Sequence, residues 1–564
     1  MIINELREKV LKAVSRRADI KKGLDKLIVE EPNNEKFGDL STNAAMVLAN
    51  VLGKNPMEIA GELKEEVISE WGRVESISIA KPGFINFNLK DDFIKKSLKQ
   101  ITEEKEKFGF NNSGNGESVQ LEYVSSNPTG KLHIGHGRWG ALGDSLANIY
   151  KANGCRVYRE YYINDYGTQV EKFSECAGCI YLKNFGVNTV YPADGYPEET
   201  VSMAVDRLIE KYGDRFLITG KGEKQLDKEP FKREIVEVMV SYISETLALM
   251  GVEFDSWFYE SSLYKNSNFD RVIEDLKKKG AVYSRDGALW FRASSYVDDK
   301  DRVLIRKDGN PTYFASDIMY LINKVERGYD RTIYILGADH HGYIGRLTAI
   351  ASALGIKEDM MVILIGQLVK IVDKGRAVKM SRRRGRLYSL RDLIQEVGKD
   401  AVRYFFTMSS LDTPMDFDIS LAKQKSNQNP VFYVQYAHAR IESIIKKLNE
   451  IKPENFDVKN FSIDRVDTSK LTFKNKSERK VAKILILYPD VVYMSCRNNA
   501  PHLITRYLHR LAAGFHYFYN HCRVVEDKGD KPVVDMDRFI LIMLVRQVLK
   551  NALKLLNVNA PGKM

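Results

Sequence analysis

The chain has 564 residues, a net charge of +11 and 44% hydrophobic residues, a composition typical of a globular protein with about three to four domains. No apolar run approaches the roughly 18 residues of a membrane span, and five cysteines in this length exclude a disulfide framework. The N-terminus lacks the apolar core of a signal peptide, so we expect a cytoplasmic protein that binds no membrane.

Residues 1 to about 112 are predicted to form a small α+β unit. The spacing of apolar residues over 1–18 predicts an amphipathic helix, and polar capping residues before Ala44 predict a second helix. Ile77–Leu89 predicts two strands around a Lys-Pro-Gly turn. Phe108–Glu117, which contains Asn-Asn-Ser-Gly-Asn-Gly, predicts a linker to the next unit.

A strand, a tight turn and a helix are predicted directly after this linker. Polar and apolar residues alternate over Gln120–Ser125, which favours a strand. Asn127-Pro-Thr-Gly130 is typical of a turn. From His133 onward apolar residues recur every three to four positions, which predicts a helix.

Two histidines stand at the start of that helix. His133 and His136 are three residues apart and so share one helical face, where free N–H groups favour phosphate. Gly135 and Gly137 leave room for a flat ring to approach the backbone. Two imidazoles there could donate to charge on a transferred phosphoryl group, although two surface histidines would show the same spacing.

The next segment is predicted to be mostly helical and connective. Arg159–Gln169 predicts a short strand and a polar turn, and Val190–Asp255 predicts an insertion that is mostly helical. Cys176 and Cys179 lie in a helical pattern without a second pair at ligand spacing. We therefore expect two small buried thiols and no metal site.

A second group of polar residues lies further along the chain. Tyr313 and Asp317 are four residues apart at a predicted helix start and should face one way. Thr332–Tyr343 predicts a buried strand that ends in polar residues, among them His340 and His341. Ligands of open α/β sheets sit at the carboxyl ends of strands. Two histidine pairs at such ends favour function over the usual fate of a single core histidine.

Two acids are candidates for binding a cation. Glu122 lies just inside the strand before the turn, and Asp317 lies on the facing element. A guanidinium is a planar fork of donors that prefers carboxylates. A carboxylate in an otherwise apolar strand costs energy unless it is paired, which favours a binding role for Glu122 over a surface position on an edge strand.

A basic loop follows a predicted strand, Val362–Ile371. Residues 376–386 carry six cations and one glycine. Such a loop beside a cleft could hold the β- and γ-phosphates of a nucleotide. The same composition would also suit a patch for nucleic acid or an acidic partner.

The chain beyond about Lys425–Pro430 is predicted to be a basic helix bundle. Helices are predicted at Val431–Leu448, Lys474–Tyr488, Ala500–Cys522 and Asp537–Leu556. Residues 431–564 hold 23 Lys and Arg against 13 Asp and Glu, as in a polyanion-binding module or a solvated basic face. Phe432–Arg440 and Phe515–Arg523 interleave aromatic residues with His and Arg, which suits stacked RNA bases as well as core packing.

These motifs resemble those of a known family. His133-Ile-Gly-His136 resembles the first signature of class I aminoacyl-tRNA synthetases, and the longer string from Ser125 to Asp144 is similar to the bacterial arginyl-tRNA synthetase version. Lys379-Met-Ser-Arg-Arg383 resembles the second signature, Lys-Met-Ser-Lys-Ser, with Arg382 in place of the second lysine. The resemblance extends over the whole chain.

The resemblance implies an α/β fold in which residues 113–425 form a Rossmann-like parallel-sheet catalytic domain with a connective insertion at about 190–255. Residues 1–112 would be an N-terminal α+β domain that contacts tRNA, and 426–564 an all-α anticodon-binding domain. L-arginine and ATP, carried with Mg²⁺, would give arginyl-adenylate and pyrophosphate. Arginine would then pass to the 3′-terminal adenosine of tRNA(Arg), on a monomeric enzyme.

The resemblance also implies site residues. Catalysis is expected of His133, His136, Lys379, Lys131 and Arg382. ATP binding is expected of Gly135, Gly137, Asp339, Met380 and Ser381. Arginine binding is expected of Glu122, Ser126, Asn127, Tyr313, Asp317 and His340. Contacts to tRNA are expected of Phe37, Asn43, Tyr436, Arg440 and Arg523.

Three alternatives stay open. Either Arg382 or Lys131 could replace the missing second lysine of the signature. A class I synthetase for another amino acid would lack the pair of acids that suits arginine. A tRNA-binding homologue without catalysis is favoured by the altered second signature alone.

Overall fold

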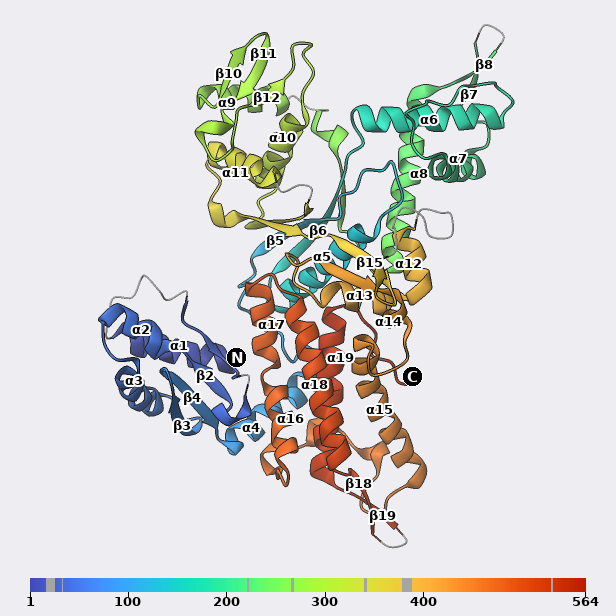
Figure 1. Cartoon of the computed structure of the whole chain (residues 1–564). Coiled ribbons are helices and arrows are strands. Elements are labelled where there is room, and N and C mark those ends of the chain that lie inside the picture. The colour runs from blue at the N-terminus through green and yellow to red at the C-terminus, as the bar shows by residue number, and fades with distance from the viewer. Residues whose placement is uncertain are drawn as a thin grey trace. The chain divides into compact units, whose positions relative to one another are not determined.

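The computed structural model describes residues 1–16, 26–32, 34–220, 223–264, 268–338, 342–377, 388–528 and 531–564. Within these ranges the chain forms two compact units (Figure 1). One joins Met1–Ser113 with Lys425–Met564, and the other is Gly114–Gln424. None of the helices in the described ranges is both long and apolar enough to cross a membrane.

The unit of residues 114–424 is built on a sheet of five parallel strands. Their order is β14-β13-β5-β6-β9. The strands are β5 (Ser118–Tyr123), β6 (Arg156–Ile163), β9 (Ser256–Tyr259), β13 (Arg331–Gly337) and β14 (Met361–Gly366). Every residue of the central β5 is buried, as expected for a strand covered on both faces. The Rossmann-like parallel sheet is therefore confirmed, and α5 (Ile134–Ala152) is the helix predicted after the turn.

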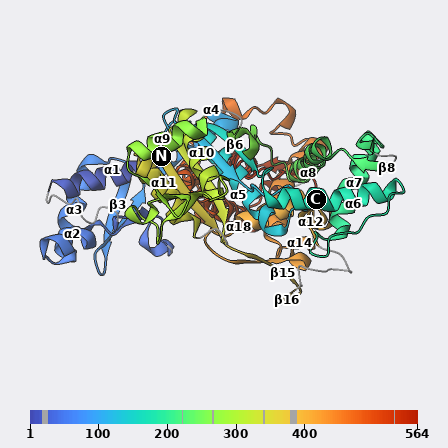
Figure 2. The ribbon, with the colours of Figure 1, turned by 90° about the horizontal axis from the view of Figure 1, so that it is seen from above.

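Two groups of elements are inserted between the strands, and they lie apart in both views (Figures 1 and 2). The first group contains α6 (Thr168–Asn184), α7 (Glu198–Tyr212), β7 (Leu217–Gly220), β8 (Glu223–Leu226) and α8 (Lys228–Leu249). The prediction of a mostly helical insertion is correct but omitted the β7–β8 hairpin. The second group contains α9 (Asn268–Lys278), β10 (Val282–Arg285), β11 (Ala288–Phe291), β12 (Arg302–Ile305), α10 (Tyr313–Glu326) and α11 (Tyr343–Leu354).

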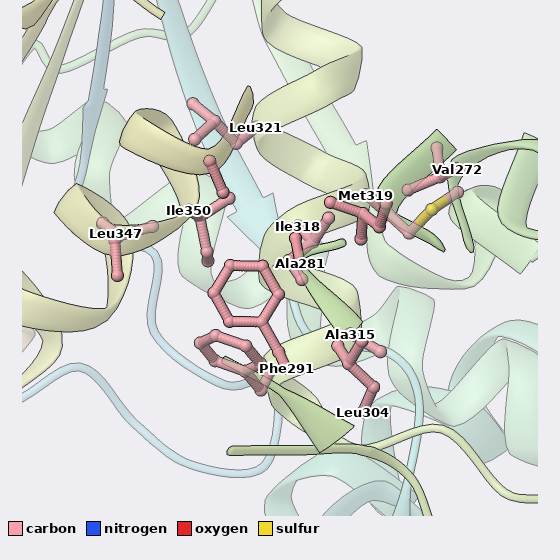
Figure 3. Close-up of a cluster of buried hydrophobic side chains, with 14 of the residues drawn as sticks. Val272, Ala281, Phe291, Leu304, Ala315, Ile318, Met319, Leu321, Leu347 and Ile350 are labelled. Atoms are coloured by element: carbon pink, nitrogen blue, oxygen red, sulfur yellow. The ribbon is translucent and has the colours of Figure 1, made fainter. Parts of the chain in front are cut away.

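The second group has its own apolar core. Figure 3 shows Phe291, Ile318 and Ile350 pointing toward one another from β11, α10 and α11. All three side chains are buried. This core fixes the position of α10, the helix that carries Tyr313 and Asp317.

The predicted strand over Val362–Ile371 is wrong in one respect, because it is two strands. β14 ends at Gly366, and β15 (Val369–Asp373) belongs to another sheet. That sheet pairs β15 with β16 (Arg376–Ala377) and β17 (Met415–Asp418). The remaining helices of this unit are α12 (Leu390–Val397), α13 (Lys399–Thr407) and α14 (Ile419–Lys423).

The other unit combines an antiparallel sheet with a helix bundle. Its N-terminal part contains α1 (Ile2–Ser15), β1 (Val29–Glu30), β2 (Leu40–Thr42), α2 (Ala44–Leu52), α3 (Pro56–Glu70), β3 (Val74–Ala80), β4 (Phe84–Leu89) and α4 (Asp91–Glu104), with sheet order β1-β2-β4-β3. Its C-terminal part contains α15 (Pro430–Ile451), α16 (Lys476–Ile486), α17 (Tyr488–Arg497), α18 (His502–His521), the hairpin β18 (Val525–Lys528) and β19 (Lys531–Val534), and α19 (Met536–Leu555). The four predicted C-terminal helices are present, while α17 and the hairpin were not predicted.

Candidate active site

A cavity of about 1230 Å³ lies at the carboxyl edge of the five-stranded sheet. It is lined from the ends of β5, β6 and β13 and from the first turns of α5, α10 and α11. This is where an open α/β sheet binds its ligands. The cavity wall brings together predicted residues that are nearly 200 positions apart in the sequence: Glu122, Ser126, Asn127, Lys131, His133, Gly135, His136, Tyr313 and Asp317.

The two histidines cap α5 reciprocally. The backbone N–H of His136 donates to Nδ1 of His133 (3.3 Å), and the backbone N–H of His133 donates to Nδ1 of His136 (3.2 Å). The rings stack with their centroids 3.5 Å apart. Because each Nδ1 accepts a hydrogen bond, each neutral ring carries its proton on Nε2. The pair therefore offers two Nε2–H donors at one helix start.

The ring of His136 is held neutral by its surroundings. Burial, and then the proximity of His133, lower the pKa of His136 well below its ordinary value. A proton on Nδ1 would also break a capping bond. Neutral imidazoles suit hydrogen bonding to a phosphoryl group without a change of charge during the reaction.

The two glycines beside the histidines have different surroundings. Gly135 lines the cavity, consistent with close approach of a ligand. Gly137 is buried outside the cavity lining, and a Cβ there would lie 2.3 Å from Leu390 and 3.0 Å from Phe406. The predicted reason for Gly137, room for a flat ring, is therefore corrected: its missing side chain makes room for α12 and α13.

The loop after β5 is strained and held from β6. Val124 and Ser125 have positive φ values of 71° and 40°, which cost energy for residues with a Cβ. Tyr161 anchors the loop, since its hydroxyl accepts from the N–H of Ser126 (3.0 Å) and donates to the carbonyl of Ser126 (2.9 Å). Asn127 donates to Gln169 Oε1 (2.5 Å), which also lines the cavity.

Glu122 has a partner inside the protein. Its Oε2 accepts from the ammonium of Lys324 (2.5 Å), and its Oε1 accepts from Ser125 Oγ (3.2 Å). Both Glu122 and Lys324 are buried. Lys324 therefore provides the partner that a carboxylate in an apolar strand requires. Glu122 nevertheless also lines the cavity.

Asp317 lies one turn into α10. Burial raises the pKa of its carboxyl to about 7, while a hydrogen bond donated by Tyr343 and the charge of Arg346 oppose that rise. Tyr313 lies four residues earlier on the same face and is half exposed. Tyr313 and Asp317 both line the cavity, which is consistent with the prediction that their side chains face the same way.

A third acid, Glu260, was not predicted. It is buried on the cavity wall directly after β9 and accepts from Ser316 Oγ (2.7 Å). Burial raises its pKa. Its position at the carboxyl end of a parallel strand could have identified it, but the strand Ser256–Tyr259 was not recognised. Tyr343, Arg346 and Lys324 were also missed, because their contacts depend on the three-dimensional fold.

The remaining residues predicted for this site either lie on the cavity wall or lie outside the described ranges. Lys131 lies on the cavity wall, and its ammonium is 3.2 Å from Glu199 on α7. Six predicted residues and His341 lie outside the described ranges: Asp339, His340, Lys379, Met380, Ser381 and Arg382. In the part of the chain that is described, no group of three or more His, Cys, Asp or Glu is arranged to hold a metal ion.

The residues predicted to contact tRNA lie in the other unit. Phe37 and Arg523 are exposed. Asn43 is used locally, since its side chain accepts from the N–H of Ile28 (2.8 Å) and donates to the carbonyl of Lys26 (2.9 Å). Arg440 lies over the rings of Tyr436 and Tyr519, with its guanidinium carbon 4.9 and 4.8 Å from their centroids.

Comparison with protein families assigns the class. The model for the class I (R) tRNA synthetase catalytic domain matches residues 97–407. The arginyl tRNA synthetase N terminal domain matches 4–89, and the DALR anticodon binding domain matches 434–564. The parallel sheet and the cavity at its carboxyl edge are thus those of a class I aminoacyl-tRNA synthetase.

Individual relatives narrow the class further. The arginine–tRNA ligase of Caldanaerobacter subterraneus subsp. tengcongensis is 42% identical over 99% of this chain and 98% of its own length, and that of Bacillus subtilis is 40% identical over 100% of both. The Thermus thermophilus arginyl-tRNA synthetase, 21% identical, shares the fold over the full length of both chains with a TM-score of 0.75. The chain belongs to the arginyl-tRNA synthetase family, whose members activate arginine and attach it to tRNA(Arg).

Proposed function

We propose that this protein activates L-arginine and transfers it to tRNA(Arg) in the cavity of residues 114–424. One observation carries the proposal: a single cavity wall holds His133, His136 and the acids Glu122 and Asp317. The histidine side suits the phosphates of ATP, and the acidic side suits a guanidinium.

In the first step, the arginine carboxylate attacks the α-phosphorus of ATP and pyrophosphate leaves. His133 and His136 donate through Nε2–H to the charge that builds up on the phosphoryl oxygens. Lys131, together with Lys379 and Arg382, offsets the charge of the leaving pyrophosphate. ATP brings Mg²⁺ as its counter-ion. Glu122 and Asp317 hold the guanidinium, so the reacting carboxylate is placed by binding at its far end.

In the second step, the terminal ribose of tRNA(Arg) attacks the arginyl-adenylate and AMP leaves. Residues 1–112, with Phe37 and Asn43, contact the tRNA body. Residues 426–564, with Tyr436, Arg440 and Arg523, bind the anticodon by stacking and phosphate contacts. The enzyme acts as a monomer in the cytoplasm.

An aminoacylation assay with total tRNA and each of the twenty amino acids tests this function. Arginine alone should be attached, and ATP should be consumed to AMP and pyrophosphate. Attachment of another amino acid would show that the acids do not select a guanidinium. Binding of tRNA without any aminoacylation would instead favour a non-catalytic homologue.

A further inference from the structure

Two buried carboxylates lie side by side on adjacent strands in the middle of the five-stranded sheet. Glu122 on β5 is in register with Glu160 on β6 and with Tyr334 on β13. Side chains in register on adjacent parallel strands are neighbours, about 5 Å apart. Glu122 and Glu160 are 6% and 1% exposed, so their repulsion is little screened by water.

Each carboxylate has its own cation: Lys324 lies on α10, and Arg327 is the residue that follows this helix as its C-cap. Glu160 accepts two bonds from Arg327, and it also accepts from Tyr320 (2.7 Å) and Gln120 (2.8 Å). Among the described residues, Lys324 is the cation that forms an ion pair with Glu122. Loss of Lys324 would therefore leave Glu160 paired and Glu122 unpaired.

Lys324 is fixed in position by an aromatic cage. Its side chain is fully buried, and its ammonium lies 3.7 Å from the ring centroid of Tyr334 and 4.3 Å from that of Tyr320. Burial lowers the pKa of Lys324, despite the opposing charges of Glu122 and Glu160. A cation held over two ring faces and against a carboxylate has little freedom to move.

Lys324 also belongs to the helix face that reaches the cavity. Tyr313, Asp317, Tyr320 and Lys324 lie four, three and four residues apart, so they form one stripe along α10. The first three line the cavity. Lys324 lies one turn deeper and meets the cavity wall through Glu122.

We propose that Lys324 is a positioning residue for arginine recognition, which keeps the carboxylate of Glu122 oriented toward the substrate cavity. The inference rests on the proposed role of Glu122 in binding the guanidinium. Lys324 occupies one carboxylate oxygen and leaves a fixed, charged acceptor toward the cavity. Without the ammonium, the carboxylate loses the contact that fixes its orientation.

The test compares Lys324→Met with Lys324→Arg, which keeps the charge. Arginine KM and ATP KM are measured in aminoacylation of tRNA(Arg) at about pH 7, relative to wild type. Lys324→Met should raise arginine KM about tenfold or more at pH 7 with ATP KM within about twofold. Lys324→Arg should restore most of the arginine affinity.

Charged and titratable groups other than Glu122 also face this region, and the comparison with wild type accounts for them. They are Glu160, Glu260, Asp317, Arg327, Arg346, Tyr162, Tyr320, Tyr334 and Tyr343. Arg327→Met is the matched control, because it removes the nearby cation that pairs with Glu160. It should lower the melting temperature and leave arginine KM unchanged.

The results distinguish the proposed role of Glu122 from the proposed role of Lys324. If Glu122→Gln leaves arginine KM unchanged, the proposed role of Glu122 is wrong and the inference falls with it. If Glu122→Gln raises arginine KM but Lys324→Met does not, the inference alone is wrong. A deficit of Lys324→Met that Arg327→Met shares, or that Lys324→Arg does not relieve, would reduce Lys324 to a structural ion pair and contradict the proposal.

Discussion

Asp317 shows how a single buried carboxyl connects substrate affinity to pH. Its pKa is raised to about 7 by burial, and a bound guanidinium favours the ionised form. Arginine KM of the wild-type enzyme should therefore fall as the pH rises from about 6 to about 8. Asp317→Asn should raise arginine KM about 100-fold at pH 8 and remove its pH dependence, with ATP KM nearly unchanged. Steady-state aminoacylation measures all three.

The buried carboxyl of Asp317 should also lower the free energy of unfolding when it is ionised. Unfolded Asp317 loses its proton near pH 3.8 and the folded side chain near pH 7, so the folded state binds more protons between these values. The free energy of unfolding therefore falls as the pH rises through this window. Asp317→Asn should be about 1–3 kcal/mol more stable than wild type at pH 8 and equal to it near pH 4. Thermal unfolding that shows a less stable variant at pH 8 would contradict the assignment.

His136 has two roles that one pair of substitutions separates. His136→Ala removes both the acceptor for the His133 N–H and the Nε2–H donor. His136→Gln keeps an acceptor at the third helical position, as in a capping box. Both should lower kcat by about 10²–10³, whereas the free energy of unfolding should fall by about 1 kcal/mol in the alanine variant alone. Near-normal turnover in either variant would remove the catalytic role.

Local spacing was enough to find part of this site. The His133–His136 and Tyr313–Asp317 pairs follow from helical periodicity, and Glu122 from an acid in an apolar strand. The partner of Glu122 could not be found in this way, because Lys324 is 202 residues away and meets it through strand order. Gly137 was misjudged for the same reason, since its neighbours Leu390 and Phe406 come from distant helices.

At the scale of elements, α5 packs closely against its neighbours, and substitutions at two of its glycines test this packing. A Cβ on Gly143 would lie 2.4 Å from the ring of Tyr123, which packs on Phe254 with centroids 4.6 Å apart. A Cβ on Gly140, one turn earlier, would make an ordinary contact at 3.5 Å. Gly143→Ala should therefore destabilise by about 2 kcal/mol or more. Gly140→Ala should be neutral or stabilise by up to about 1 kcal/mol.

Denaturant unfolding of the two alanine variants measures this difference. Equal stabilities would show that Tyr123 moves freely, contrary to its packing.

Element boundaries were predictable where a single hydrophobic period, that of a helix or that of a strand, extends over the whole segment. The break between β14 and β15 was missed because the apolar run continues through it, although Leu368 is 66% exposed and the chain changes sheets there. The β7–β8 and β18–β19 hairpins are four residues per strand, too short to show an alternating pattern.

At the scale of the whole molecule, the two ends of the chain form one unit, held in part by Arg479. This residue of α16 donates to both oxygens of Asp39 (3.0 and 2.8 Å) and to Asp91 (2.6 Å). Burial works to raise the pKa of Asp39, yet the bonds from Arg479 and the N–H of Leu89 hold it below its usual value. Arg479→Met leaves a buried carboxylate short of its partner and should destabilise by about 3 kcal/mol.

Lys480→Met is the control for this prediction. Lys480 is the next residue, and its ion pair with Glu35 is exposed, so the loss should be below about 1 kcal/mol. Calorimetry of both variants decides between them, and equal losses would show that Arg479 does not join residues 1–113 to 425–564. Sequence could not predict this junction, because no periodic pattern relates segments more than 400 residues apart.

The central claim is that one cavity holds the phosphates of ATP at its histidine side and a guanidinium at its acidic side. A crystal structure with L-arginine and a non-hydrolysable ATP analogue tests it most directly. The account predicts the guanidinium within hydrogen-bonding distance of Glu122 and Asp317, and the α-phosphate beside Nε2 of His133 and His136. An arginine side chain bound away from both acids, or phosphates remote from the two imidazoles, would contradict it.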